Sequence, residues 1–116
     1  MDVHGHTVRG VDVDPETRCR HYDSEVDVIA IRFPCCGTFY PCYECHLTAA
    51  DHEPERWDAE DGDAPAVLCG ICGSVLTVEE YLACDDHCPE CNAEFNPGCR
   101  RHYARYFSPA LFEEES

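Results

Sequence analysis

Short stretches of the chain alternate between apolar and polar residues, which is the pattern of short strands. Residues 26–33, VDVIAIRF, combine a period of two with β-branched side chains and predict a strand. The segment AVLCGICGSVL, at residues 66–76, predicts a strand, a tight turn and a second strand. No apolar run approaches the roughly eighteen residues that a membrane helix needs. The pattern therefore predicts a soluble fold built on small hairpins.

Helical signals are also short. Residues 35–52 predict a cysteine-rich turn that leads into a short helix, and residues 53–65 predict an acidic loop. Thr77 is a suitable helix N-cap, and Glu80 three positions later completes a capping box. A further short helix is predicted over residues 99–107, and the tail EEES is expected to be frayed. We expect one domain over residues 1–116, with a core from about 10 to 107 and flexible termini.

Charge changes the picture of the surface. The chain has 24 acidic and 8 basic residues, a net charge of −16, and every basic residue is an arginine. Such a charge disfavours binding to nucleic acid or to an anionic membrane. It predicts a salt-adapted surface, and the alternative is an acidic protein that binds a basic partner. The cluster at Arg100, Arg101 and Arg105 is expected to pair with acidic neighbours rather than with phosphates.

Eleven cysteines in 116 residues exceed ordinary usage several-fold, so metal or covalent links are expected to supplement a small apolar core. The start, MDVHGHTVRG, has neither the basic nor the apolar region of a secretory signal, which predicts a reducing, cytoplasmic location. Cysteine patterns in that setting indicate metal binding before disulfides, and the odd cysteine count agrees. Disulfide bonding remains the main alternative.

Three C-x-x-C pairs are the strongest chemical signal. They are Cys42/Cys45, Cys69/Cys72 and Cys88/Cys91. Two intervening residues let a tight turn aim both sulfurs at one tetrahedral ion, and Gly70 and Gly73 are expected to supply the positive φ of such a turn. Cys19 and His21 alternate along an extended segment, so both side chains point to the same side. A closed tetrahedral set of Cys and His is typical of structural zinc.

Two pairs of ligand-type residues are adjacent in the chain, Cys35-Cys36 and Cys45-His46. Neighbouring side chains in an extended segment point in opposite directions, so each pair is expected to serve two different ions. One assignment that satisfies this condition has three ions, bound by Cys19, His21, Cys42 and Cys45; by Cys35, His46, Cys69 and Cys72; and by Cys36, His52, Cys88 and Cys91. Spacing alone does not fix this grouping.

Several motifs together resemble the CHY-type zinc finger: TRCRHY, CCGTFYPCYECH with the later DH, the two later C-x-x-C pairs and FNPGC..H. The resemblance covers roughly residues 10–107. It implies three interleaved zinc ions and supports the grouping above. Larger relatives add a RING domain and act as ubiquitin ligases, but this chain resembles the small stand-alone form. One mitochondrial intermembrane-space member of that form assists the assembly of small import chaperones, which implies a protein- or zinc-handling role.

Some candidate ligands lie outside the set of twelve. Cys99 and His102 are predicted to be ligands, either of a fourth ion or at the third centre, and Cys84 and His87 are not. His4 and His6 are expected at the surface. Trp57 is expected either to anchor a partner or to cover a zinc lobe.

The sequence therefore predicts a small zinc-stabilised α+β domain, with short β-hairpins, zinc-binding turns and short helices around three or four interleaved zinc sites. Its predicted function is a zinc-binding module that mediates protein interaction or assembly, without catalytic activity. The alternative is a protein that transfers zinc or electrons through the region of Cys84 and Cys99. A zinc enzyme is disfavoured because only this region, with Glu90 or Glu94 as base, offers an open metal position. A redox-active or deaminase reading of PCYEC lacks the βαβ setting or the upstream H-x-E.

Overall fold

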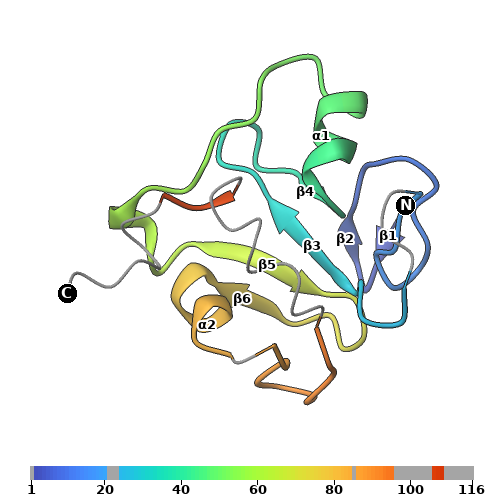
Figure 1. The fold of residues 1–116 in the computed structure, drawn as a ribbon, viewed down its shortest axis with the longest axis vertical. Helices are drawn as coiled ribbons and strands as arrows, with labels where there is room; N and C mark the ends of the chain where they lie inside the picture. The colour runs from blue at the N-terminus through green and yellow to red at the C-terminus, as the bar shows by residue number, and fades with distance from the viewer. Residues whose placement is uncertain (1, 21–23, 85, 96–105, 109–116) are drawn as a thin grey trace.

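A four-stranded antiparallel sheet forms the centre of the protein (Figure 1). The computed structural model describes residues 2–20, 24–84, 86–95 and 106–108. The strands of the sheet are β3 (Ile29–Arg32), β4 (Phe39–Tyr40), β5 (Pro65–Cys69) and β6 (Val75–Thr77), in the order β4-β3-β5-β6. The structure thus confirms the predicted strand within residues 26–33 and the strand–turn–strand that follows residue 65, and it confirms the α+β fold class.

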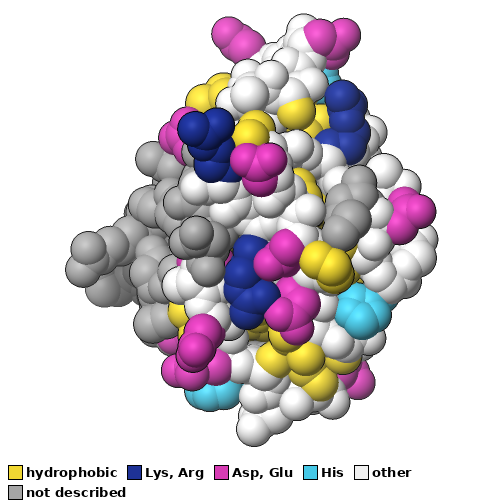
Figure 2. All heavy atoms as spheres, turned by 90° about the vertical axis from the view of Figure 1, so that its right-hand side faces the viewer, with side chains coloured by type: hydrophobic (Ala, Val, Ile, Leu, Met, Phe, Trp, Pro, Cys, Tyr) yellow, Lys and Arg dark blue, Asp and Glu magenta, His cyan; other side chains and the backbone are white. Residues whose placement is uncertain are grey.

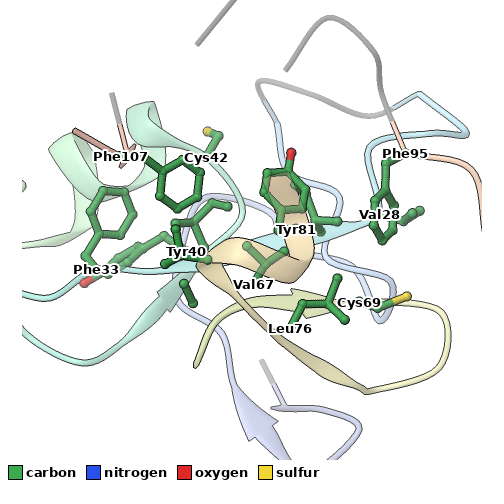
Figure 3. Packing of buried hydrophobic residues seen from close by; sticks show 14 of the residues in the cluster. Val28, Phe33, Tyr40, Cys42, Val67, Cys69, Leu76, Tyr81, Phe95 and Phe107 are labelled. Carbon is green, nitrogen blue, oxygen red and sulfur yellow. The ribbon is translucent and has the colours of Figure 1, made fainter. Parts of the chain in front are cut away.

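Successive side chains of a strand point to opposite faces of the sheet. Here both faces carry buried apolar side chains, in two separate clusters. Ile31 lies opposite Val67 on one side and Tyr40 on the other, and all three belong to the larger buried cluster. Leu68 and Ala30, which are also paired, belong to a smaller cluster on the other face. Figure 3 shows aromatic side chains packed over the larger cluster.

The smaller cluster is closed by a hairpin that precedes the predicted core. Strands β1 (Asp2–Val3) and β2 (His6–Thr7) pair through a tight turn, and Val3 and Val8 are buried. Val8 forms a bridge with Phe39 at the edge of the sheet. His4 lies at the surface, and its Nε2 is 2.9 Å from the carbonyl oxygen of Gly70. The first residues of the chain therefore contribute to the core.

Two short α-helices flank the sheet. Helix α1 (Tyr43–Ala49) lies beside β4, and α2 (Val78–Leu82) lies beside β6 (Figure 1). The predicted capping box of α2 is confirmed, because Glu80 N–H donates to Thr77 Oγ1 at 3.1 Å and Thr77 N–H donates to Glu80 Oε1 at 3.0 Å. Neither α-helix of the described residues is long and apolar enough to cross a membrane.

The acidic loop after α1 contains a 3-10 turn, η1 (Ala59–Asp61), and one aromatic anchor. Trp57 is only 8% exposed, and its Nε1–H donates to the carbonyl of Arg32 at 2.7 Å. Its backbone N–H donates to the carbonyl of Tyr106 at 2.8 Å. Trp57 therefore ties residues 106–108 to the end of β3. Its burial argues against one of its two predicted roles, that of an anchor for a partner. The rest of the predicted helix over 99–107, and the tail after 108, lie outside the described residues.

The two glycines of the β5–β6 turn have different physical roles. Gly73 has φ of 82°, as predicted. The same prediction is wrong for Gly70, which is not among the described residues with positive φ. A Cβ on Gly70 would lie 2.2 Å from the carbonyl oxygen of Glu16. Gly70 is therefore required because the loop that precedes Cys19 packs directly on the turn.

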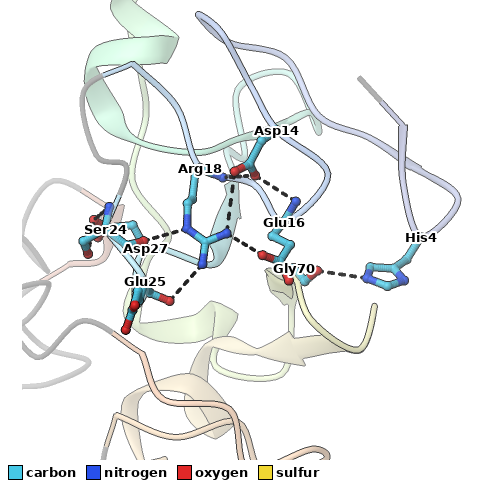
Figure 4. A network of polar contacts seen from close by, with 8 residues as sticks. All are labelled: His4, Asp14, Glu16, Arg18, Ser24, Glu25, Asp27 and Gly70. Carbon is cyan, nitrogen blue, oxygen red and sulfur yellow. Dashed lines mark hydrogen bonds and ion pairs between the residues drawn. The ribbon is translucent and has the colours of Figure 1, made fainter.

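Arg18 holds that loop in place (Figure 4). Its guanidinium donates to the backbone carbonyl of Ser24 at 2.7 Å and to that of Glu25 at 3.0 Å, and it pairs with Glu16. The backbone N–H of Arg18 donates to Asp14 Oδ1 at 2.9 Å. The hydrogen bond with Glu16 is the main cause that raises the pKa of Arg18. This network fixes the loop next to Cys19.

Candidate metal centres

Cysteine and histidine side chains converge at three places in the described residues. In each group the potential ligand atoms lie within 4.8 Å of one another. We name them the buried centre (Cys19, Cys42 and Cys45), the mixed centre (Cys35, Cys36, His46 and His52) and the knuckle centre (Cys69, Cys72, Cys88 and Cys91). The mixed centre comes from one stretch, residues 35–52, whereas the other two each join segments more than a dozen residues apart.

The spacing of the donor atoms fits a tetrahedral zinc ion. Zn–S bonds of about 2.3 Å place two sulfurs about 3.8 Å apart, and a sulfur and an imidazole nitrogen about 3.5 Å apart. The Sγ atoms of Cys19 and Cys42 are 3.6 Å apart, and those of Cys69 and Cys91 are 3.8 Å apart. These separations are far longer than the roughly 2.05 Å of a disulfide bond. The donor sets therefore have both the chemistry and the dimensions of zinc sites.

The buried centre lies at the N-terminus of α1. Cys42 is the N-cap of this helix, and its Sγ accepts a hydrogen bond from the N–H of Cys45 at 3.4 Å. The Sγ of Cys45 accepts another from the N–H of Val11 at 3.5 Å. The contact with Cys19 is the main cause that raises the pKa of both Cys42 and Cys45. Several thiolates in this buried space therefore need a cation. The predicted fourth ligand, His21, lies outside the described residues.

The knuckle centre joins two turns with the same backbone design. In each turn the N–H of the residue after the second cysteine donates to the carbonyl of the first cysteine, at 2.9 Å for Gly73 and 2.8 Å for Asn92. Both residues have positive φ, 82° for Gly73 and 63° for Asn92. The two turns face each other, since Cys72 Sγ lies 3.8 Å from Cys88 Sγ. The sequence therefore predicted the positive φ of Gly73 but not that of Asn92.

The charges of the knuckle centre also favour a bound cation. Burial tends to raise the pKa of the Cys72 thiol, but hydrogen bonds from the side chain and backbone of Ser74 and from neighbouring thiols lower it to about 6. Burial is the main cause that raises the pKa of Cys69. One sulfur is thus already stabilised as a thiolate, which is the form that binds zinc.

The mixed centre lies between the β3–β4 turn, α1 and the segment that follows α1. The Nε2 atom of His46 is 3.4 Å from Cys35 Sγ and 3.9 Å from Cys36 Sγ. His52 completes the group, and its hydrogen bond to Cys36 is one of the causes that lower the pKa of this thiol against the effect of burial. Cys36 and His52 are exposed, whereas His46 is fully buried.

The prediction that Cys35 and Cys36 serve different ions is wrong. Both lie in a tight turn in which the carbonyl of Phe33 accepts hydrogen bonds from Cys36 N–H at 3.4 Å and Gly37 N–H at 2.8 Å. Side chains do not alternate in such a turn, and the two Sγ atoms are 4.0 Å apart. The predicted groupings of Cys35 with Cys69 and Cys72, and of Cys36 with Cys88 and Cys91, are therefore wrong as well.

The other adjacent pair behaves as predicted, for a different reason. Cys45 belongs to the buried centre and His46 to the mixed centre. Both residues are in α1, where successive side chains are about 100° apart around the axis. Helix α1 therefore connects two centres.

His46 is fixed by its surroundings. Its ring centroid lies 4.4 Å from that of Phe33 and 4.8 Å from that of Tyr40. Burial lowers its pKa, and the nearby charge of His52 lowers it further. A neutral imidazole that presents Nε2 to two sulfurs is in the form required of a zinc ligand.

The remaining candidates lie apart from the three centres. Cys84 is half-buried against the larger core cluster, and His87, Glu90 and Glu94 are exposed. None of the four belongs to a ligand group in the described part of the chain. The two other predicted ligands, Cys99 and His102, lie outside the described residues.

Known proteins that are similar to this chain include zinc fingers. The family model described as CHY zinc finger matches residues 19–106. "Helper of Tim protein 13" from Kluyveromyces lactis is 44% identical over 95 residues, which cover 82% of either chain. The protein of the same name from Saccharomyces cerevisiae is 41% identical over 103 residues, 86% of this chain and 89% of the relative. An uncharacterised protein from Schizosaccharomyces pombe is 45% identical over 103 residues, 89% of this chain and 90% of the relative.

The family match spans all three groups of converging cysteines and histidines and includes the adjacent pairs at residues 35–36 and 45–46. The relatives from Kluyveromyces lactis and Saccharomyces cerevisiae are similar over most of both chains. This chain belongs to the CHY zinc finger family.

Proposed function

We propose that this protein is a zinc-stabilised module that binds three structural zinc ions and assists the assembly of other proteins. The observation that carries the proposal is the convergence of cysteines and histidines into three groups with tetrahedral spacing. The mixed and knuckle centres each offer four protein ligands, and His21 is the predicted fourth ligand of the buried centre. A centre closed by four protein ligands has no position for a substrate, so we propose a structural and not a catalytic role for zinc.

Two observations support an assembly role. Relatives that match over most of both chains are named Helper of Tim protein 13, which describes help to another protein. Acidic side chains are spread over the face that carries α1 and the N-terminal hairpin, with arginines between them (Figure 2). Among the described residues, this face shows no dense basic patch for nucleic acid. We propose that the partner is a protein of the Tim type.

This role predicts that the chain replaces its relative in cells. We expect it to restore the assembly of Tim proteins in S. cerevisiae cells that lack Helper of Tim protein 13, measured by the abundance of assembled Tim complexes on native gels. Cys45→Ser should fail because it removes a ligand of the buried centre, whereas Cys84→Ser, outside the three groups, should restore assembly. Failure of the wild-type chain at a protein level equal to that of the relative would reject this role.

A second candidate function is the transfer of zinc, and the exposed ligands of two centres favour it. Cys36 and His52 of the mixed centre and Cys91 of the knuckle centre are exposed, so an incoming thiolate could reach an ion there, whereas Cys19, Cys42 and Cys45 of the buried centre are at most 3% exposed. We expect at least one ion to exchange with added ⁶⁷Zn within minutes and at least one to be retained, as measured by native mass spectrometry. Retention of all the ions over hours would exclude zinc transfer and leave the structural role.

A further inference from the structure

The two histidines of the mixed centre are held in different ways. His46 is fully buried between Phe33 and Tyr40, and packing alone fixes its ring. His52 is exposed and lies on a segment outside the helices and strands. Its ring packs edge-on against His46, with centroids 4.9 Å apart. Packing therefore constrains His52 much less than His46.

The residue before His52 supplies the missing constraint. Asp51 Oδ1 lies 3.1 Å from His52 Nδ1. A carboxylate accepts hydrogen bonds and cannot donate them, so this contact places the ring proton on Nδ1. Nε2 is then left with its lone pair, which is the state that binds a metal. Cys36 is the other hydrogen-bond partner of the His52 side chain. The ring thus contacts both a carboxylate and a sulfur of the centre.

We propose that Asp51 is a positioning residue of the mixed centre, whose carboxylate holds His52 in the Nδ1–H tautomer and directs Nε2 toward the zinc ion. This inference rests on the proposed occupancy of the mixed centre by zinc. A carboxylate bound to the distal nitrogen of a metal-binding histidine fixes the ring and makes the other nitrogen a stronger donor. Loss of such a partner typically weakens metal binding about 10- to 100-fold.

The test compares three variants by zinc affinity. Asp51→Ala removes the hydrogen bond, Asp51→Asn keeps an acceptor oxygen without the charge, and Glu53→Ala removes an exposed acidic group one residue beyond His52. Affinity is measured by competition with a chromophoric chelator, and native mass spectrometry counts the ions. We expect Asp51→Ala to lower the binding affinity of one zinc ion by about 10- to 100-fold. Asp51→Asn should be intermediate, and Glu53→Ala should stay within about twofold of wild type.

A second readout separates positioning from general stability. Zinc bound at Nε2 keeps the proton on Nδ1 in every variant, so the readout is the exchange of that proton with water, followed on the imidazole N–H signals of the zinc-loaded protein. We expect the Nδ1–H signal of His52 to persist in the wild type and in Asp51→Asn, and to be broadened by exchange with water in Asp51→Ala, while His46 is unchanged in all three.

Two results would overturn the inference in distinguishable ways. Wild-type protein that holds zinc through His52, with unchanged zinc affinity and unchanged Nδ1–H exchange in Asp51→Ala, would overturn the inference alone. Wild-type protein in which His52 shows no zinc-bound signal would overturn the proposed occupancy of the mixed centre, and the role of Asp51 with it.

Discussion

Removing zinc will unfold the whole domain, and not only the turns that bind it. Five cysteines of the three centres, Cys19, Cys42, Cys45, Cys69 and Cys88, belong to the larger buried cluster. Their sulfurs would become mutually repelling or protonated groups inside the core when the cation leaves. Structural zinc in small domains contributes about 10–16 kcal/mol of binding free energy, whereas a whole domain is typically stable by only about 5–15 kcal/mol. Loss of the ions should therefore remove the folded state.

The measurement is the dispersion of amide NMR signals and the far-ultraviolet circular dichroism during titration with a high-affinity zinc chelator under reducing conditions. We expect both signals to be lost as the ions leave and to return when zinc is added. The same chelator loaded with zinc beforehand is the control, because it has the same chemistry without free binding capacity. A protein that loses its ions but keeps dispersed amide signals would show that the apolar core suffices.

Acid should also unfold the domain, because protons compete with zinc for its ligands. Zinc binds thiolates and neutral imidazoles, so the pKa of each ligand is lower in the zinc-bound protein than in the unfolded chain. A group with a depressed pKa stabilises the folded state above its unfolded pKa, about 8.5 for cysteine, and this stabilisation is lost as the pH falls through the folded value. We therefore expect unfolding on acidification, at a lower pH when zinc is in excess.

The elements that the sequence predicted correctly are those with local signals. The strand in residues 26–33 has a period of two, and α2 begins at a capping box that needs only Thr77 and Glu80. The turn at Cys69 and Cys72 is likewise local, with the predicted positive φ at Gly73, whereas the positive φ of Asn92 was not predicted. The N-terminal hairpin was missed because strands of two residues have no measurable period.

The predicted grouping of Cys19 with Cys42 and Cys45 is confirmed, but the other two groupings could not be predicted, because they depend on tertiary structure. Alternation along an extended chain separates Cys35 from Cys36, but the β3–β4 connection is a tight turn that brings them together. The knuckle centre needs the Cys69 and Cys88 turns to meet, and no local signal encodes that contact. The motif DH contained a signal for Asp51, since an acidic neighbour of a histidine ligand is a frequent partner of its ring.

Cys36→Ser will loosen the mixed centre and leave the knuckle centre intact. The sequence had grouped Cys36 with His52, Cys88 and Cys91, and the structure keeps His52 but replaces the two cysteines by Cys35 and His46. Loss of one of four direct ligands should weaken zinc binding at the mixed centre by more than the 10- to 100-fold expected for loss of a hydrogen-bonding partner of a ligand. Native mass spectrometry should therefore find one ion fewer at moderate chelator concentrations.

Amide hydrogen exchange locates the change. Protection should fall at Gly37, in the β3–β4 turn, and at Ala50, whose N–H donates to the carbonyl of His46 at the end of α1. The N–H of Asn92, which donates a hydrogen bond to the carbonyl of Cys88 at 2.8 Å, should stay protected, because its turn shares no ligand with the mixed centre. The matched variant Cys91→Ser, also at an exposed cysteine, should produce the reverse pattern. Increased hydrogen exchange at Asn92 in Cys36→Ser, with Gly37 unchanged, would mean that Cys36 binds the ion of the knuckle centre and that the grouping is wrong.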